Sequence, residues 1–324
     1  MSTSNIKHLV NIASLSNDEF ISLINNAQHF KTIYKSGNIS KIKSNHEKLL
    51  GKTIALLFSK RSTRTRISSE GASAFFGAQP MFLGKDDIQL GVNESMYDTT
   101  KVISSMVSCI FARVNKHQDI LDLAKDSSAP IINSLCDKYH PLQAITDIMT
   151  IKESFGYTKG LKLAWIGDAN NVINDLAIAA LKSGINVSIA IPESVKFDSD
   201  VESDAVKLAN ETGVKFEILN DPIEALNNAN VLVTDTWVSM GDESKKIEKL
   251  KQFNGFQITK ELIEKGKVNE NWKFMHCLPR HPEEVDDIVF YSPNSVVFQE
   301  AENRLYAAIA VINGFVINKG DLLK

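Results

Sequence analysis

The feature that most restricts the fold of this sequence is a regular alternation of short apolar runs with longer stretches of helical periodicity. Apolar runs of strand length recur at residues 53–59, 80–84, 109–114, 130–135, 162–168, 186–192, 215–219, 230–236, 273–279 and 295–300. Helical stretches follow them; residues 174–184 and 199–213, for example, each end in a glycine that fits a C-cap. Short buried strands alternating with helices predict parallel sheets that are covered on both faces.

These runs are too many for one small sheet, and a long helical segment at residues 141–156 falls among them. The chain of 324 residues is also long enough for two domains of about 150 residues each. We therefore predict an α/β fold with two doubly wound parallel-sheet domains, at residues 1–145 and 155–298, and a C-terminal helix, 300–324, that packs back on the first. Because such sheets bind ligands at the carboxyl ends of their strands, we expect an active-site cleft between the domains.

Composition narrows the class of protein. The formal net charge of −3 gives no electrostatic reason to expect nucleic acid or an anionic membrane as a partner. No apolar run approaches the ~20 residues that span a bilayer. Cys109, Cys136 and Cys277 lie far apart and form no CxxC pair, which suits a reducing compartment. The N-terminal residues lack the apolar core of a signal peptide and the arginines of a mitochondrial leader, so we expect a cytoplasmic protein.

Hydroxyl and guanidinium groups are concentrated immediately after the run at 53–59. The segment consists of Ser62, Thr63, Arg64, Thr65 and Arg66. A helix that starts here presents unpaired N–H groups and the positive end of its dipole, both of which favour an anion, and arginine adds a planar fork for phosphate or carboxylate oxygens. A capped helix with surface arginines is the alternative. The segment is not a P-loop, because GxxxxGK[ST] is absent, so nucleotide hydrolysis is disfavoured.

Two further runs in the first half of the chain end in polar groups. Arg113 closes the run at 109–114 and, taken alone, fits a structural ion pair as well as a ligand contact. His140 follows the run at 130–135, and Pro141 suits the first position of a helix, which would put His140 and Gln143 at the helix start. There His140 could donate to a carbonyl oxygen and Gln143 could accept from an amide, although a histidine before a helix is often only a cap.

In the second half, "IGDANN" at 166–171 occupies the turn where a dinucleotide-binding fold carries GxGxxG. The second and third glycines are missing, which argues against an NAD-dependent dehydrogenase, and Asn170 and Asn171 place amides there instead. Asp235 ends the run at 230–236, and Ser239 and Met240 follow in a loop. Asp235 could bind an ammonium group and Asn171 could bind a carboxylate, so the two together suit an amino-acid ligand.

The stretch "KFMHCLPRHPEE" at 273–284 joins a cysteine to a histidine, which raises the alternatives of a thiol nucleophile or a metal site. Adjacent residues on a strand point to opposite faces, so His276 and Cys277 are poorly disposed as a nucleophile and its base. A zinc site would need another His or Cys at suitable spacing, and the other cysteines lie in the other half of the chain. We expect Cys277 to make a non-covalent contact and His276 to be structural.

Taken together, these segments resemble the aspartate/ornithine carbamoyltransferase family, and within it the ornithine-specific branch in its fungal forms. The matching motifs are "STRTR" at 62–66, "FLGKDDIQLGVNES" at 82–95, "HPLQ" at 140–143, "DTWVSMG" at 235–241, "HCLPR" at 276–280 and "AENR" at 301–304. They occur in the family's order and spacing, and the resemblance extends over nearly the whole chain, from about residue 8 to about residue 318. Aspartate-specific members lack "SMG" and typically carry proline where Cys277 stands, so the resemblance favours ornithine over aspartate.

The resemblance implies a set of site residues. The implied ligands of carbamoyl phosphate are Ser62, Thr63, Arg64, Thr65, Gln89, Arg113, His140, Gln143, Cys277, Leu278 and Arg304. The implied ligands of ornithine are Asn171, Asp235, Ser239, Met240 and Cys277. Arg113, His140, Cys277 and Arg304 are implied to be catalytic, and no metal or organic cofactor is implied.

The implied activity is direct transfer of the carbamoyl group from carbamoyl phosphate to the side-chain amine of L-ornithine, giving L-citrulline and phosphate, without a covalent enzyme intermediate. In the family, the loop that holds Gln89 approaches the site of a neighbouring subunit, which implies a homotrimer. Yeast relatives also associate with arginase, which makes arginase a candidate regulatory partner. A different amine acceptor, such as putrescine or an acylated ornithine, is the nearest rival.

Overall fold

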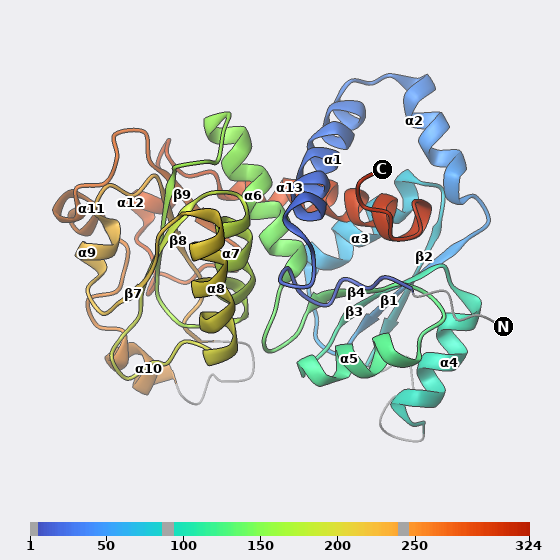
Figure 1. The fold of residues 1–324 in the computed structure, drawn as a ribbon, viewed down its shortest axis with the longest axis horizontal. Helices are drawn as coiled ribbons and strands as arrows, with labels where there is room; N and C mark the ends of the chain where they lie inside the picture. Colours follow the sequence, from blue (N-terminus) through green and yellow to red (C-terminus); the bar gives the residue numbers. More distant parts are fainter. Residues whose placement is uncertain (1–5, 86–93, 239–245) are drawn as a thin grey trace. The chain divides into compact units, whose positions relative to one another are not determined.

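A computed structural model describes residues 6–85, 94–238 and 246–324 (Figure 1). The chain divides into two compact units. Unit 1 consists of residues 1–149 and 302–324, and unit 2 consists of residues 150–301. The divisions fall inside helix α6 (Pro141–Phe155) and helix α13 (Val297–Val311). None of the helices within the described ranges combines the length and apolarity needed to cross a membrane.

Unit 1 is built on a parallel sheet of four strands in the order β2-β1-β3-β4. The strands are β1 (Thr53–Phe58), β2 (Gln79–Gly84), β3 (Cys109–Arg113) and β4 (Ile131–Leu135). Besides the first part of α6 and most of α13, its helical segments are α1 (Asn17–Lys35), α2 (Ile39–His46), η1 (Glu47–Leu49), α3 (Thr63–Phe75), α4 (Met96–Met106), α5 (His117–Asp126) and the π-helical η3 (Ile312–Ile317). The parallel sheets predicted from the apolar runs are confirmed here.

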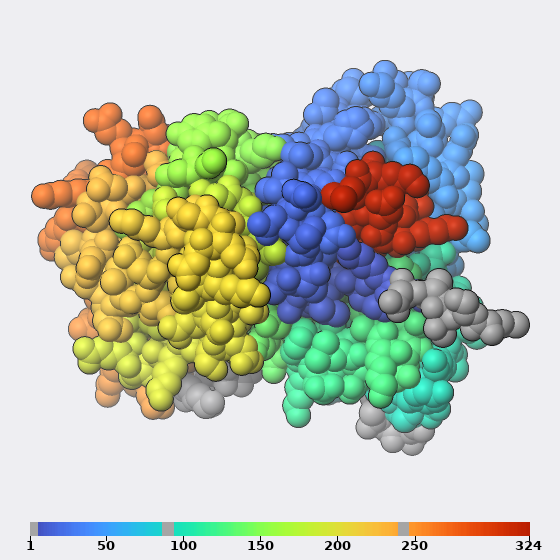
Figure 2. Space-filling view, viewed as in Figure 1, coloured from blue at the N-terminus to red at the C-terminus, as the bar shows by residue number. Residues whose placement is uncertain are grey.

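The two ends of the chain pack together in unit 1. Figure 2 shows the C-terminal residues (red) against the N-terminal helices (blue). The Lys31 ammonium on α1 donates to the Asn303 side chain on α13 at 2.8 Å. Leu322, near the C-terminus, is buried. Within this unit, helix α13 thus contacts α1, and it continues into η3.

Unit 2 contains a parallel sheet of five strands in the order β7-β6-β5-β8-β9. The strands are β5 (Lys162–Ile166), β6 (Asn186–Ala190), β7 (Phe216–Leu219), β8 (Val231–Thr234) and β9 (Lys273–His276). Its other helices are α7 (Asn171–Lys182), α8 (Ser199–Thr212), α9 (Pro222–Leu226), α10 (Lys246–Gln252), α11 (Lys260–Gly266) and α12 (Asp287–Phe290).

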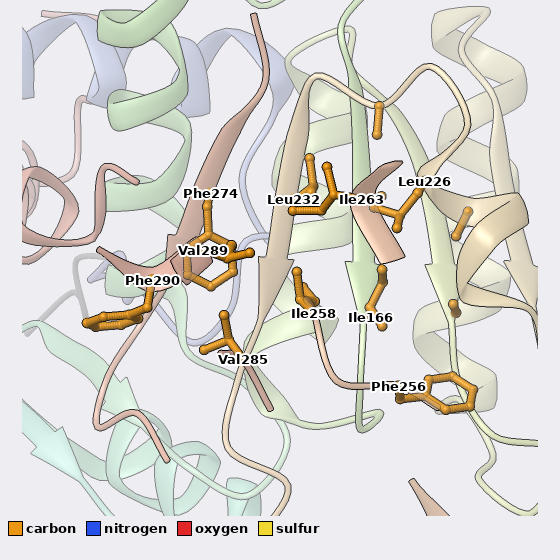
Figure 3. Close-up of a cluster of buried hydrophobic side chains, with 14 of the residues drawn as sticks. Ile166, Leu226, Leu232, Phe256, Ile258, Ile263, Phe274, Val285, Val289 and Phe290 are labelled. Atoms are coloured by element: carbon orange, nitrogen blue, oxygen red, sulfur yellow. The ribbon is translucent and has the colours of Figure 1, made fainter. Parts of the chain in front are cut away.

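An apolar cluster supports one face of the second sheet (Figure 3). Leu232 on β8 and Phe274 on β9 are fully buried in it, and Ile258 and Val285 pack there from outside the sheet. Ile258 and Val285 also form an isolated parallel bridge. Full burial of each such side chain contributes about 1.5–3 kcal/mol, so the cluster holds β8 and β9, whose ends carry polar residues, in fixed register.

Helix α8 shows how the local sequence sets an element's bounds. Asp198 caps its start by accepting hydrogen bonds from the N–H groups of Asp200 and Val201. The helix ends at Gly213, whose φ of +72° is the left-handed conformation that favours glycine. The prediction of a helix at 199–213 is confirmed. Helix α7 instead starts at 171, three residues before the predicted stretch, because Asn170 caps it.

The predicted strand at 295–300 is wrong. Ser295 forms only an isolated bridge to Phe274, and helix α13 starts at Val297. The Phe274 N–H donates to the Asn294 carbonyl, and the Val296 N–H donates back to the Phe274 carbonyl, so that pairing stops after one residue. A short apolar run does not by itself distinguish a strand from a buried helix start.

Two glycines allow a test of local backbone strain. Gly77 and Gly213 both have positive φ, at +77° and +72°, but a Cβ at 213 meets nothing within 4 Å, whereas one at 77 lies 2.1 Å from the His46 carbonyl oxygen. We expect Gly213→Ala to lower the free energy of unfolding by about 1 kcal/mol through backbone conformation alone. Gly77→Ala adds a steric clash and should cost clearly more. Thermal and urea denaturation measure both, and equal losses would contradict the assigned clash.

Candidate functional site

The hydroxyl and arginine segment lies at the start of α3 in unit 1. Ser62 caps the helix in an extended conformation, and its Oγ accepts from the Thr65 N–H at 3.3 Å and donates to the Thr65 Oγ1 at 3.0 Å. Thr65 is buried, Ser62 and Arg64 are half-buried, and Thr63 is exposed. The predicted helix start after β1 is confirmed, and it presents first-turn N–H groups beside hydroxyl and guanidinium groups.

The two arginines of the segment have different surroundings. The Arg66 guanidinium lies 4.0 Å from the centre of the Phe82 ring, and its Nε donates to Glu70 at 2.9 Å. Both contacts hold Arg66 on the exposed side of α3. Arg64 instead carries its charge close enough to His140 to lower the pKa of that imidazole. Only Arg64 of this pair therefore belongs to the polar cluster around His140.

Arg304, from α13, is the centre of this cluster, all of whose members belong to unit 1. Its Nη1 donates to the Gln143 side-chain oxygen, and its Nη2 lies 3.2 Å from Thr65 Oγ1 and 3.4 Å from His140 Nε2. Arg304 is 3% exposed. One guanidinium group therefore contacts three of the predicted site residues, which come from α3 and from the start of α6.

His140 is electrically neutral in this cluster. Burial lowers the pKa of the imidazole well below its usual value, and the positive charges of Arg304, Arg113 and Arg64 lower it further. Its Nε2 faces the Arg304 guanidinium, which has no acceptor atom, so Nε2 accepts and the proton lies on Nδ1. Arg113 is the last residue of β3 and is also buried. As predicted, Pro141 is the first residue of α6.

Asp147 fixes the orientation of the Gln143 amide, a role that the sequence had not indicated. The Gln143 Nε2 donates to Asp147 Oδ1 at 2.7 Å, while its oxygen accepts from Arg304. Both side chains are buried. The spacing of four residues on one helix, which places two side chains on the same face, is the signal that could have revealed this pair.

In unit 2, Asp235 and Cys277 lie side by side. Asp235 directly follows β8 and Cys277 directly follows β9, and the preceding residues, Thr234 and His276, are paired in register. The Cys277 thiol donates to Asp235 Oδ1 at 3.0 Å. Asp235 is 5% exposed. Two parallel neighbouring strands thus bring a carboxylate and a thiol to the same edge of the sheet.

Asn170 holds the other oxygen of this carboxylate. Its Nδ2 donates to Asp235 Oδ2 at 2.8 Å, while its Oδ1 accepts from the Val172 N–H at 2.9 Å. Asn171, a predicted ligand, is the next residue and the first of α7. The sequence showed two amides in this turn but did not show which of them contacts Asp235.

His276 belongs to a separate, buried network. Its Nε2 lies 3.3 Å from Glu284 Oε1, and its Nδ1 accepts from the Leu278 N–H at 2.9 Å. The Glu284 carboxyl also accepts from the His281 N–H at 2.5 Å. The imidazole therefore faces Glu284 while the neighbouring thiol faces Asp235, as the opposite faces of a strand require. Leu278 packs against the apolar cluster of unit 2.

Three of the predicted site residues, Gln89, Ser239 and Met240, lie outside the described residues. Across residues 6–85, 94–238 and 246–324, no group of three or more His, Cys, Asp or Glu side chains is arranged to hold a metal ion.

Comparison with known proteins identifies the class to which this arrangement belongs. Residues 7–153 match the model of the carbamoyl-P binding domain, and residues 159–314 match that of the Asp/Orn binding domain, of aspartate/ornithine carbamoyltransferase. The chain therefore belongs to the aspartate/ornithine carbamoyltransferase family, whose members are carbamoyl-transferring enzymes.

Fungal ornithine enzymes are among its most similar relatives. The chain is 65% identical to the mitochondrial ornithine transcarbamylase of Pachysolen tannophilus, over 98% of this chain and 91% of that protein. It is 62% identical to the ornithine carbamoyltransferase of Saccharomyces cerevisiae, over 98% and 96%. The crystal structure of a mitochondrial ornithine carbamoyltransferase from Coccidioides immitis superposes with a TM-score of 0.90 at 52% identity, covering 98% of this chain and 99% of that one. The predicted resemblance to fungal ornithine enzymes is confirmed.

These comparisons contradict the expected cytoplasmic location. The relatives from Pachysolen tannophilus and Coccidioides immitis are both named mitochondrial. The expectation rested on the absence of arginine and of an apolar segment near the N-terminus, and that composition does not determine the compartment.

Glu284 gives the fold a testable pH dependence. Burial raises the pKa of its carboxyl to about 7. Because this value exceeds the ~4.3 of an unfolded glutamate, the protonated carboxyl contributes stability that is complete below pH ~4.3 and is lost as the pH rises through about 7. Glu284→Gln stays neutral and keeps an acceptor oxygen for the His281 N–H. We expect the wild-type melting temperature to fall more between pH 5 and pH 8 than that of Glu284→Gln; parallel profiles would contradict the assignment.

Proposed function

We propose that the protein transfers the carbamoyl group of carbamoyl phosphate to the side-chain amine of L-ornithine, giving L-citrulline and phosphate. The observation that carries the choice of substrate is the Asp235–Cys277 pair, with Sγ to Oδ1 at 3.0 Å. A buried carboxylate beside a thiol suits an ammonium or amine group, whereas the side chain of aspartate would need a cation. The names of the fungal relatives support the same substrate.

Unit 1 supplies most of the proposed carbamoyl phosphate site. The proposed ligands are Ser62, Thr63, Arg64, Thr65, Gln89, Arg113, His140, Gln143, Cys277, Leu278 and Arg304. The start of α3 and the Arg64 guanidinium suit the phosphate oxygens, since both favour negative charge. Support comes from the arginines around His140, whose positive charges add to burial in lowering the pKa of that imidazole. The match of residues 7–153 to a carbamoyl-P binding domain also supports it.

The proposed catalytic residues stabilise charge that develops on the carbamoyl group. Arg113, Arg304 and His140 act on the carbonyl oxygen, where a tetrahedral intermediate becomes negative, and such fixed charges and dipoles usually contribute most of the rate enhancement in enzymes. A neutral His140 polarises the carbonyl by hydrogen bonding and does not require an imidazolium ion. Gln143, with its amide oriented by Asp147, directs its oxygen toward donors such as the carbamoyl NH2.

Unit 2 supplies the proposed ornithine site. The proposed ligands are Asn171, Asp235, Ser239, Met240 and Cys277. Asn171 suits the α-carboxylate, and Asp235 with Cys277 suits the side-chain amine. A free aliphatic amine has a pKa of about 10, so producing its neutral form at pH 7 costs roughly 4 kcal/mol. Asp235 and Cys277 orient the amine for attack, and the proton that it finally loses can leave with the phosphate.

The proposed transfer is direct. The amine nitrogen forms a bond to the carbamoyl carbon, and the bond from that carbon to the phosphate oxygen breaks. Cys277 is not the nucleophile in this scheme, because its thiol donates its proton to a hydrogen bond with Asp235. Arg113, His140, Cys277 and Arg304 thus act through contacts and charge.

Assembly and location complete the proposal. We propose a homotrimer, in which the loop of Gln89 serves a neighbouring subunit, and light scattering tests this assembly. We retain arginase as a candidate partner, which a pull-down with arginase tests.

The names of the Pachysolen tannophilus and Coccidioides immitis relatives support a mitochondrial location. Fractionation of cells that express the full-length protein tests it, and recovery outside mitochondria would count against it.

A citrulline-formation assay tests the reaction itself. Carbamoyl phosphate is supplied with ornithine, aspartate or putrescine in parallel, and citrulline should form rapidly only with ornithine. Carbamoylation of putrescine at an equal rate would assign a different amine acceptor, and the absence of any product would refute the proposal.

The two arginines of the α3 start form a matched pair of variants. Arg64→Ala should abolish saturation by carbamoyl phosphate, because it removes a guanidinium group that suits the phosphate. Arg66→Ala removes an arginine two residues away that stacks on Phe82 and pairs with Glu70. Its KM for carbamoyl phosphate should stay within about threefold of wild type, as expected for an exposed pair. Steady-state kinetics decide; equal effects would remove Arg64 from the phosphate site.

Cys277→Ala tests the role of the thiol. It removes the hydrogen bond to Asp235 and one contact to the amine, so we expect a KM for ornithine raised by about tenfold and a lower kcat, with catalysis still detectable. Mass spectrometry of the wild-type enzyme quenched during turnover provides the second measurement. A carbamoyl adduct on Cys277 would overturn the direct transfer.

A further inference from the structure

We propose that Asn170 is a positioning residue that fixes the Asp235 carboxylate for the amine of the acceptor substrate. This inference rests on the proposed function, because it assigns Asn170 a part in recognising the cationic end of ornithine. Asn170 is outside the predicted ligand set, and it acts through Asp235 without contacting the substrate itself.

Both the oxygen and the nitrogen of the Asn170 side-chain amide make hydrogen bonds. The oxygen accepts from the N–H groups of Val172 at 2.9 Å and Ile173 at 3.4 Å, as an N-cap of α7. The nitrogen donates to Asp235 Oδ2 at 2.8 Å. Exchanging oxygen and nitrogen would lose the cap and bring two oxygens together at Asp235, so the amide has one allowed orientation. The cap thereby directs the NH2 group at the carboxylate.

The turn that carries Asn170 is fixed by contacts to its neighbours. The Thr234 hydroxyl, at the end of β8, donates to the Ile166 carbonyl at the end of β5 at 2.6 Å. The Trp165 indole N–H donates to the Asp168 carbonyl at 2.9 Å. The Asp168 carboxylate in turn forms an ion pair with Lys249 on α10. These contacts therefore fix the turn that carries Asn170, the amide donor to Asp235.

Each carboxylate oxygen of Asp235 accepts a hydrogen bond from a different side chain. Oδ2 receives the Asn170 amide and Oδ1 receives the Cys277 thiol, so neutral donors contact both oxygens of a carboxylate that is 5% exposed. Hydrogen-bond donors of this kind offset the cost of burying a carboxylate. Because neither donor carries a positive charge, the negative charge stays available for a cationic amine. Removing the amide donor would weaken and misdirect the attraction for the amine while leaving contacts to the other end of the substrate in place.

The test uses Asn170→Ser, which keeps an N-capping side chain but is too short to reach Asp235. We expect its KM for ornithine to rise by about tenfold, with the KM for carbamoyl phosphate within about twofold of wild type. L-norvaline, which has the carbon chain of ornithine but no side-chain amine, is the second probe. Its inhibition constant should stay unchanged, since Asn170 acts through Asp235 on the amine alone.

Three results would overturn the inference. An unchanged KM for ornithine in Asn170→Ser excludes the role. An equal rise in the ornithine KM and the norvaline inhibition constant would show that Asn170 only shapes the turn. The matched control is Asn38→Ser, which alters the exposed N-cap of α2. There Asn38 accepts from the Lys41 N–H at 3.0 Å. A similar rise in the KM for ornithine in Asn38→Ser would also refute the role. A wild-type enzyme that makes no citrulline would instead refute the proposed function.

A second variant keeps the inference testable if Asn170→Ser is poorly folded. Asn170→Asp is nearly isosteric and caps a helix equally well, but it places a carboxylate against Asp235. Two carboxylates at that distance share a proton, so the melting temperature of the variant should fall more steeply than that of wild type as the pH rises from 5 to 8. A profile parallel to wild type would show that the two side chains are not in contact and would overturn the inference.

Discussion

The parallel arrangement of the strands is the constraint on which the candidate site depends. All of the strand pairs in the described part of the chain run parallel, so within each sheet the carboxyl ends of the strands meet at one edge. Arg113 ends β3, while Asp235 and Cys277 follow β8 and β9. Residues more than forty positions apart in sequence, such as Asp235 and Cys277, become hydrogen-bonded neighbours through this geometry and the apolar cluster that holds β8 against β9.

The two units present opposite electrostatic environments. In unit 1, burial lowers the pKa of His140 and the nearby guanidinium groups lower it further, so the imidazole stays neutral among positive charges that an anion compensates. In unit 2, a buried carboxylate is held by an amide and a thiol, an environment that a cationic amine compensates. The proposed substrates have matching charges, since carbamoyl phosphate is an anionic acyl phosphate and ornithine is an amino acid with an ammonium side chain. Charge of either sign inside a protein is costly unless a partner offsets it, so these clusters favour ligands of opposite sign.

The sequence predicted those features that depend on local chemistry. Alternating apolar runs predicted the parallel sheets, Gly213 marked the end of α8, and Pro141 marked the start of α6. The run at 295–300 was misassigned because a buried helix start and a short strand have the same apolar composition. The contact from Asn170 to Asp235 spans 65 positions and joins two polar side chains, and periodicity carries no information about such a pair. The contact from Gln143 to Asp147, in contrast, could have been predicted from their spacing of four residues on one helix.

The place of Arg304 has a consequence for how the enzyme is made. This residue follows the whole of unit 2 in the sequence, yet it contacts Thr65, His140 and Gln143 in a unit whose sheet is complete by residue 135. Domains generally form from the N-terminus onward while the ribosome elongates the chain. The first sheet can therefore assemble early, but its polar cluster must wait until unit 2 has been synthesised and α13 has emerged. A nascent chain that stalls before α13 would present the Thr65, His140 and Gln143 side chains without the arginine that joins them.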